Sequence, residues 1–149
     1  MRRLPLLIGA LAALATPALA SDDPIATRQR LMDNNGAAAA LAGGVLKGEL
    51  DYSQPVGNAA IQAWSATAIA VGDYFPEGSA DPERSRASPK IWEDMAGFQA
   101  ALVKFQDAVA AAREAGGDKG PETKEAFAGL ATPVLETCKG CHETYRLED

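Results

Sequence analysis

Residues that bind metals or carry redox chemistry are scarce in this sequence. Its 149 residues include two cysteines, one histidine and three methionines. This scarcity sets a tight limit on any metal or redox site, because only a few positions can supply the ligands. Ligation of one metal ion by two histidines of this chain is excluded.

Strand patterns, a second long apolar run and an excess of basic residues are also missing. No stretch after the first 20 residues approaches the roughly 20 apolar residues that cross a bilayer. Alanine is abundant and β-branched runs are absent, so nothing alternates with the period of a strand. The formal net charge of −6 makes nucleic acid and anionic lipid poor partners.

The first 20 residues have the pattern of a secretory signal peptide. Two arginines precede an apolar run over residues 4–15, and Ala18-Leu19-Ala20 fits a cut before Ser21. Processing would leave 129 residues with 12 basic and 20 acidic side chains, a formal net charge of −8. That length suits one domain over residues 21–149. We expect a periplasmic protein with no membrane insertion after processing.

Turn residues divide the remaining chain into four segments, and each segment predicts a helix. Glycine and proline mark breaks over residues 43–55, 76–89 and 116–121. The first helix should begin near Pro24, and the second should stop before Pro76. Because the connections are short, except for a loop over residues 76–88, the pattern favours an all-α fold, an antiparallel four-helix bundle.

The third and fourth segments have the clearest apolar patterns. We expect the third to form one helix, with Ser88 as its cap, Pro89 at its first position and Gly116-Gly117 at its end. The fourth should begin near Pro121 and be kinked or broken at Pro133, which cannot donate a ladder hydrogen bond. The apolar stripe of the third segment alternates spacings of four and three: Ile91, Met95, Phe98, Leu102, Phe105, Val109 and Ala112.

One short motif carries the chemistry. The string Cys138-Lys139-Gly140-Cys141-His142 contains both cysteines and the only histidine. Two thiols at this helical spacing can add to the two vinyl groups of a haem while the adjacent imidazole binds the iron. A structural disulfide, a thioredoxin-like pair and half of a zinc site are the alternatives. We predict one covalently attached haem c, held by Cys138 and Cys141, with His142 as an iron ligand.

The position of the motif restricts the second axial ligand. Only seven residues follow His142, so no ligand comes from downstream. Met1 belongs to the expected signal peptide, which leaves Met32 or Met95 for a thioether ligand. Met95 belongs to the apolar stripe of the third helix, where core packing explains it better. Met32 lies one turn after Arg28 and is the stronger candidate.

The chain resembles the class II cytochromes c, the cytochrome c′ family, over residues 22–149. The resemblance implies an exported four-helix bundle with haem c bound near the C-terminal helix. It also implies that Arg28 lies near the proximal histidine or a haem propionate, with Gln29 beside it, and that Met32 lies on the distal side. The runs that carry it are Arg28-Gln29-Arg30-Leu31-Met32 with Gly36 after it, Lys47-Gly48, Pro89-Lys90-Ile91-Trp92, and Cys138 to His142 continuing into Tyr145-Arg146.

The resemblance leaves two functions open. In low-spin relatives a methionine of this helix binds the iron, which implies a one-electron carrier with periplasmic redox partners. In high-spin members the distal side chain only blocks the iron face, which implies a cytochrome that binds a gas such as nitric oxide. Two stretches resemble the low-spin relatives more closely than the high-spin members. They are Met32 with residues 33–36, and residues 88–92.

We therefore favour electron transfer with iron ligated by His142 and Met32. The alternative is five-coordinate gas binding with Met32 as a non-bonded distal plug. A third possibility is a haem-free helical module with Cys138 and Cys141 in a disulfide. No nucleophile and base pair, carboxylate dyad or phosphate loop stands out, so we expect no enzyme activity. A homodimer stays open.

Overall fold

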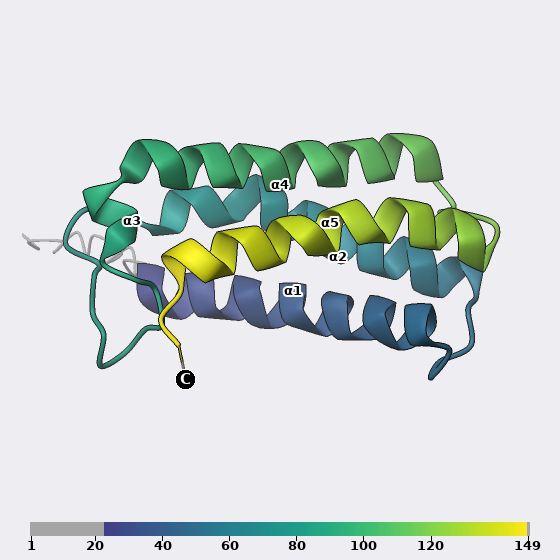
Figure 1. Ribbon diagram of the computed structural model, residues 1–149, viewed down its shortest axis with the longest axis horizontal. Helices are drawn as coiled ribbons and strands as arrows, with labels where there is room; N and C mark the ends of the chain where they lie inside the picture. The colour runs from purple at the N-terminus through teal and green to yellow at the C-terminus, as the bar shows by residue number, and fades with distance from the viewer. Residues whose placement is uncertain (1–22, 149) are drawn as a thin grey trace, which may run out of the picture.

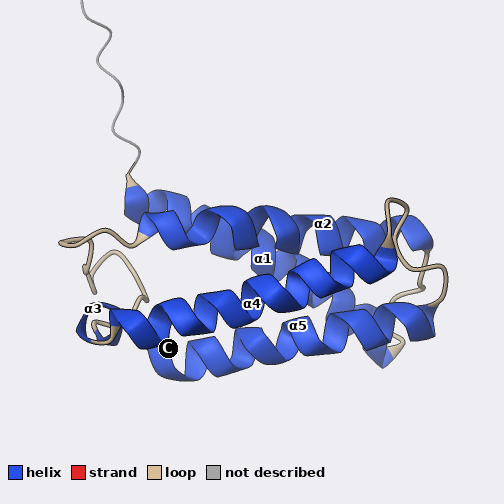
Figure 2. Ribbon diagram, turned by 90° about the horizontal axis from the view of Figure 1, so that it is seen from above, coloured by secondary structure: helices blue, strands red, loops and turns tan. Residues whose placement is uncertain are grey.

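The computed structural model describes residues 23–148, and the signal peptide expected at residues 1–20 lies outside the described residues. Four long helices pack side by side with their connections at the two ends of the bundle (Figures 1 and 2). The all-α, antiparallel four-helix bundle expected from the sequence is confirmed. Its long helices are α1 (Pro24–Lys47), α2 (Gln54–Ala70), α4 (Met95–Gly116) and α5 (Lys124–Tyr145).

Helix α1 begins and ends where local chemistry favours a boundary. The Asp23 carboxylate accepts a hydrogen bond from the Ile25 amide at 3.0 Å, and Pro24 occupies the first turn. Gly48 ends the helix with φ of 78°, a left-handed conformation that glycine adopts readily. The helix continues through Gly43 and Gly44, so the first break begins later than the glycine pair indicated.

Helix α2 is followed by a 3-10 turn, η1 (Val71–Tyr74). The helical run therefore stops before Pro76, as expected. The chain then enters the loop over residues 76–88, which returns toward the end of α5. Within residues 23–148, the only β-type pairing is an isolated antiparallel bridge between Ala87 in this loop and Arg146.

The expectation of one continuous third helix is wrong. A single turn, α3 (Lys90–Glu93), is separated from α4 by Asp94, whose φ of −132° and ψ of 59° are not helical. The Asp94 side chain accepts a hydrogen bond from the Gly97 amide at 3.0 Å and so caps α4. The apolar stripe continues on both sides of Asp94, which is why periodicity alone did not reveal the break.

Of the kink or break expected at Pro133, the break is wrong, because α5 runs as one helix through this residue. Pro133 is exposed. The carbonyl group that loses its ladder partner therefore lies on the side of the helix that water can reach. The helix keeps its direction well enough to carry residues 138–142 to the end of the bundle where α1 begins (Figure 1).

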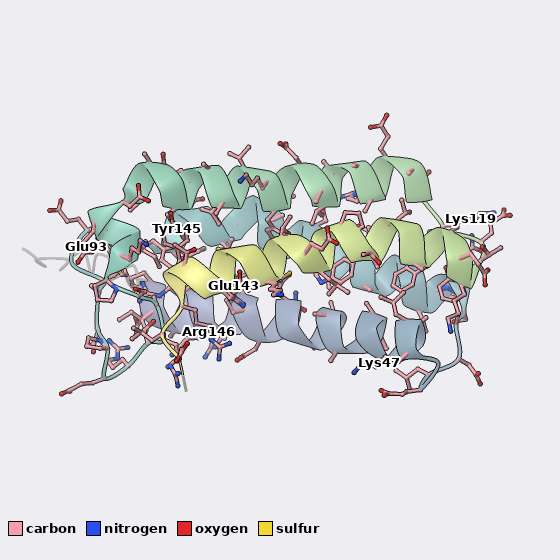
Figure 3. The ribbon with its side chains drawn as sticks, in the orientation of Figure 1. Lys47, Glu93, Lys119, Glu143, Tyr145 and Arg146 are labelled. Carbon is pink, nitrogen blue, oxygen red and sulfur yellow. The ribbon has the colours of Figure 1, made fainter. Side chains whose placement is uncertain are left out.

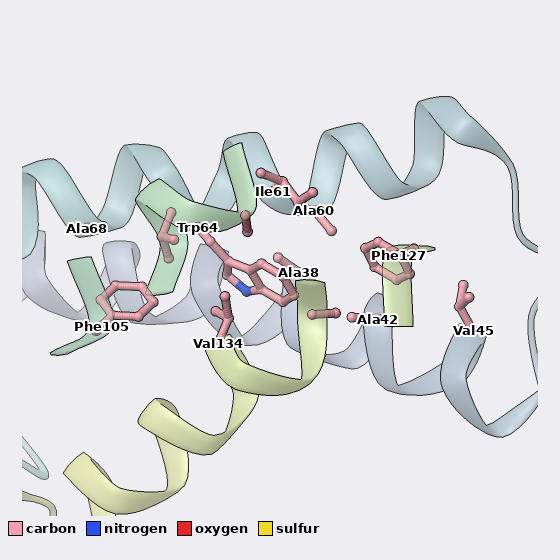
Figure 4. Packing of buried hydrophobic residues seen from close by; sticks show 13 residues of the cluster. Ala38, Ala42, Val45, Ala60, Ile61, Trp64, Ala68, Phe105, Phe127 and Val134 are labelled. Carbon is pink, nitrogen blue, oxygen red and sulfur yellow. The ribbon is translucent and has the colours of Figure 1, made fainter. Parts of the chain in front are cut away.

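Two apolar clusters fill the bundle. The larger one surrounds Trp64, which is fully buried between α2 and its neighbours (Figure 4). The smaller one is centred on Ile91, Phe98 and Tyr145 and lies where α3, α4 and the end of α5 meet. Among the described helices, none has the length and apolar character that a bilayer crossing requires.

Candidate functional site

A cavity of about 460 Å³ lies beside the smaller apolar cluster. Its walls come from α1, from Val71 and Phe75, from the loop at residues 85–87, and from α3, α4 and the end of α5. Large apolar side chains form much of this wall, among them Phe75, Phe98 and Leu102. A largely apolar ligand suits such a lining.

The structure brings together most of the site residues expected from the sequence. Arg28, Gln29 and Met32 reach the cavity from α1, and Cys141 and His142 reach it from α5. The thioether and the imidazole therefore lie on the walls of the same cavity although 110 positions separate them in the sequence. Met95 is half-buried and packs against the smaller cluster, in keeping with its interpretation as a core residue.

Cys138 is the expected site residue that does not line the cavity. Its Sγ lies 3.3 Å from the Val134 carbonyl oxygen, to which the thiol donates within the helix. It is one helical turn before Cys141, and both cysteines are half-buried and not joined in a disulfide. Rotation about the Cα–Cβ bond of Cys138 would free its thiol from Val134.

Burial sets the protonation of the groups in the motif. It raises the pKa of the Cys138 and Cys141 thiols above the ordinary value of 9.0. It lowers the pKa of His142 below 6.5, and the nearby positive charge of Arg146 adds to this effect. His142 is therefore neutral at pH 7, the form in which an imidazole binds a metal.

Arg28 is 3% exposed and its guanidinium bonds to the loop over residues 76–88 and to η1. Nη1 donates to the Tyr74 carbonyl at 3.2 Å and to the Ser79 hydroxyl at 2.9 Å. Nη2 donates to the Ser79 carbonyl at 2.8 Å and to the Ser85 hydroxyl at 3.0 Å. All four acceptors are uncharged, and burial lowers the pKa of Arg28 below its ordinary value.

Aromatic rings complete the environment of Arg28. Its guanidinium carbon lies 5.1 Å from the centre of the Phe75 ring and 5.6 Å from that of the Trp92 ring. Both separations fit cation–π contacts. The Nε atom is buried and has no hydrogen-bond partner among the described residues. Arg28 thus carries a buried, unpartnered N–H group and is one of the residues that line the cavity.

The loop over residues 76–88 is bonded to the beginning of α1 and to the end of α5. Gln29 donates from Nε2 to the Arg84 carbonyl at 2.6 Å, and Arg84 forms a salt bridge with Asp23. On the other side, the Ser88 amide donates to the Tyr145 carbonyl at 3.0 Å. The loop therefore lies against the bundle, and its residues 85–87 form one side of the cavity.

Sequence reasoning missed the serines that hold Arg28. Ser79 and Ser85 are buried, although the polar stretch in which they lie predicts a solvated loop. Only the pairing with a buried guanidinium, more than 50 positions away, explains their burial. A second helix that stops only at Pro76 would include Phe75, but Phe75 follows η1 and lines the cavity. An aromatic residue just before a proline gave no signal for that role.

Comparisons with known proteins agree with this arrangement. Residues 23–146 match the family described as Cytochrome C′. A cytochrome c-556 of Rhodopseudomonas palustris is 32% identical over 150 aligned positions, which cover 98% of this chain and 97% of the relative. A solved structure of cytochrome c′ from the same species has a TM-score of 0.75 at 28% identity, covering 85% of this chain and 98% of that one.

An NMR-validated structural model of oxidised R. palustris cytochrome c-556 has a TM-score of 0.70 at 28% identity and covers 85% of this chain and 98% of that one. The bundle is therefore shared both with a protein named cytochrome c′ and with one named cytochrome c-556. The family match extends over all five described α-helices and includes the cavity and the residues that line it. The chain belongs to the cytochrome c′ family.

Proposed function

We propose that the protein is a periplasmic one-electron carrier whose haem iron is ligated by His142 and Met32. The observation that carries this proposal is the single cavity lined by Met32, Cys141 and His142. Covalently attached haem c is the cofactor of the cytochrome c′ family, and the two cysteines of this chain fit it. The periplasmic location and redox partner rest on the signal peptide expected at residues 1–20.

The residues around the cavity fit a haem in three ways. The walls are apolar and aromatic where a macrocycle needs to exclude water. A neutral imidazole and a thioether, the ligand pair of many low-spin cytochromes, reach the cavity from α5 and α1. The buried Nε of Arg28 supplies a donor that a propionate would satisfy. Arg28 and Gln29 are accordingly assigned to the haem-binding wall.

Each residue of the motif has a defined task in this proposal. Cys138 and Cys141 form the covalent attachment, and His142 supplies the proximal ligand. When bound, the haem supplies an iron centre that cycles between the ferric and ferrous states. Met32 would hold the iron through its sulfur in both states, which would keep the reorganisation that accompanies electron transfer small. The apolar walls contributed by Phe75, Phe98 and Leu102 would cover part of the macrocycle.

Gas binding is the second candidate, because this chain matches proteins named cytochrome c′ in addition to proteins named cytochrome c-556. In that case His142 is the single strong ligand and Met32 only blocks the distal face. The two candidates share the attachment at Cys138 and Cys141. In both candidates the protein binds haem and converts no substrate.

The attachment is tested by mass spectrometry of protein made in a host that matures c-type cytochromes. We expect one haem per chain that survives acid denaturation. An unmodified chain with free or disulfide-bonded thiols would overturn the haem proposal.

His142→Ala should keep the covalent haem and change the absorption spectrum in both oxidation states, because no second histidine is present. An unchanged spectrum would refute the role given to His142.

A further inference from the structure

Tyr145 lies one turn after His142 and connects the end of α5 to the break between α3 and α4. It is 8% exposed, and its hydroxyl donates a hydrogen bond to Oδ2 of Asp94 at 3.0 Å. Figure 3 shows Tyr145 at the end of the bundle that carries α3. The bond joins two elements that are 51 positions apart in the sequence.

Asp94 uses both carboxylate oxygens in this arrangement. Oδ1 accepts from the Gly97 amide at 3.0 Å and caps α4, and Oδ2 accepts from Tyr145. The non-helical backbone of Asp94 turns its side chain back over the first turn of α4. The interruption of the third helix therefore provides the acceptor that holds the end of α5.

Gly97 leaves the space that this contact requires. A Cβ atom at this position would lie 2.5 Å from the Tyr145 hydroxyl and 2.2 Å from Oδ2 of Asp94. Both separations are below any van der Waals contact, so a larger residue would push the two groups apart. We refer to Tyr145, Asp94 and Gly97 together as the tyrosine clasp.

We propose that the tyrosine clasp positions His142 for iron ligation, an inference that rests on the proposed haem function. His142 lies in the last turn of α5, where helices fray unless something holds them. The clasp fixes this turn from one side, and the Tyr145 ring packs edge-on against Phe98 with 5.4 Å between centroids. Tyr145 and Asp94 are thus positioning residues that act on His142 through the backbone of the last turn of α5.

The other end of the bundle offers a matched control. The hydroxyl of Tyr52 donates to the Pro121 carbonyl, and its ring stacks on Phe127 at 5.4 Å. A Cβ atom on Gly57 would lie 2.7 Å from that hydroxyl. Tyr52 thus has the same surroundings in outline as Tyr145, namely a hydroxyl bond, an aromatic neighbour and a glycine beneath it. None of these residues lines the cavity.

The test compares Tyr145→Phe, Asp94→Asn and Tyr52→Phe in the haem-loaded protein. The haem-methyl NMR resonances of the oxidised form report the orientation of the axial imidazole. We expect them to shift in Tyr145→Phe and Asp94→Asn and to match the parent in Tyr52→Phe. Amide exchange in the last turn of α5 should also become about five- to tenfold faster in Tyr145→Phe, as expected for one lost hydrogen bond.

The double variant separates positioning from general loss of stability. Because Tyr145 and Asp94 act through one bond, Tyr145→Phe with Asp94→Asn should shift the resonances no further than the larger single change. Parent-like resonances in both single variants, or equal shifts in Tyr52→Phe, would overturn the positioning role while leaving the haem function standing. A parent protein without haem would instead overturn the proposed function itself.

Discussion

Arg28 and Ser79 are joined by two hydrogen bonds, one from each terminal nitrogen of the guanidinium. Nη1 reaches the Ser79 hydroxyl at 2.9 Å and Nη2 reaches its carbonyl oxygen at 2.8 Å. The Ser79 hydroxyl in turn donates to the Pro76 carbonyl at 2.8 Å. This contact fastens the loop over residues 76–88 to α1 and so keeps one wall of the cavity in place.

Replacing Arg28 by lysine should destabilise the protein. A lysine keeps the positive charge but lacks the planar fork that bonds Ser79 twice. The expected loss in the free energy of unfolding is about 1–3 kcal/mol, the range for buried hydrogen bonds to a charged group. Urea denaturation measures it.

Arg113→Lys is the control for this change. Arg113 is exposed and makes one hydrogen bond to the Ser65 hydroxyl at 3.0 Å. Its substitution should alter the free energy of unfolding by about 0.5 kcal/mol or less. Similar losses in the two variants would mean that the Arg28 contacts contribute nothing beyond those of a surface arginine.

The sequence predicted the parts of the fold and site that depend on local chemistry. Asp23 with Pro24 marks the start of α1, and the cysteine motif falls in the last turns of α5. The break at Asp94 was missed because the apolar stripe runs across it without a change of phase. The second bond of Asp94, to Tyr145, is a tertiary contact that no spacing encodes.

Two glycines should respond in opposite directions to alanine. A Cβ on Gly43 of α1 would meet nothing within 4 Å, so Gly43→Ala should stabilise the helix by about 0.5–1 kcal/mol. A Cβ on Gly57 of α2 would lie 2.9 Å from a Tyr52 ring carbon and 3.2 Å from a Phe127 ring carbon. Gly57→Ala should therefore destabilise by about 1–3 kcal/mol, because the packed rings must move. Thermal unfolding of both variants checks the difference in sign.

The salt bridge between Asp23 and Arg84 should make stability depend on pH in acid. The hydrogen bond from Arg84 is the main reason that the pKa of Asp23 lies below its ordinary value of 3.8. A lowered pKa in the folded state stabilises the protein above pH 3.8, and this contribution is lost as the pH falls through the folded pKa. Asp23→Asn should thus be less stable than the parent at pH 5–6.

The same salt bridge gives an internal check on that profile. The stability difference between the parent and Asp23→Asn should shrink as the pH falls below 3.8, and Arg84→Gln should reproduce this trend. Melting temperatures measured between pH 2 and pH 6 provide the comparison. A difference that stays constant over this interval would show that the charge of Asp23 does not stabilise the fold.

Met32→Ala should leave the haem attached and turn ferrous iron from low-spin to high-spin. The loss of the thioether should also lower the reduction potential. Carbon monoxide should bind faster than in the parent, because no ligand has to be displaced first.

Met95→Leu is the control for Met32→Ala, since Met95 packs against the smaller apolar cluster. It should keep the parent spectrum and cost less than about 1.5 kcal/mol of stability. Stopped-flow carbon monoxide binding compares the three proteins.

The absorption spectrum of the reduced, haem-loaded parent protein, without any substitution, tests the central claim most directly. If Met32 and His142 both bind the iron, the ferrous protein is six-coordinate and low-spin, and its α band is sharp and resolved from the β band. A broad, fused band would mean five-coordinate, high-spin iron with Met32 unbound. That result would contradict electron transfer through His142–Met32 ligation and support gas binding at the distal face.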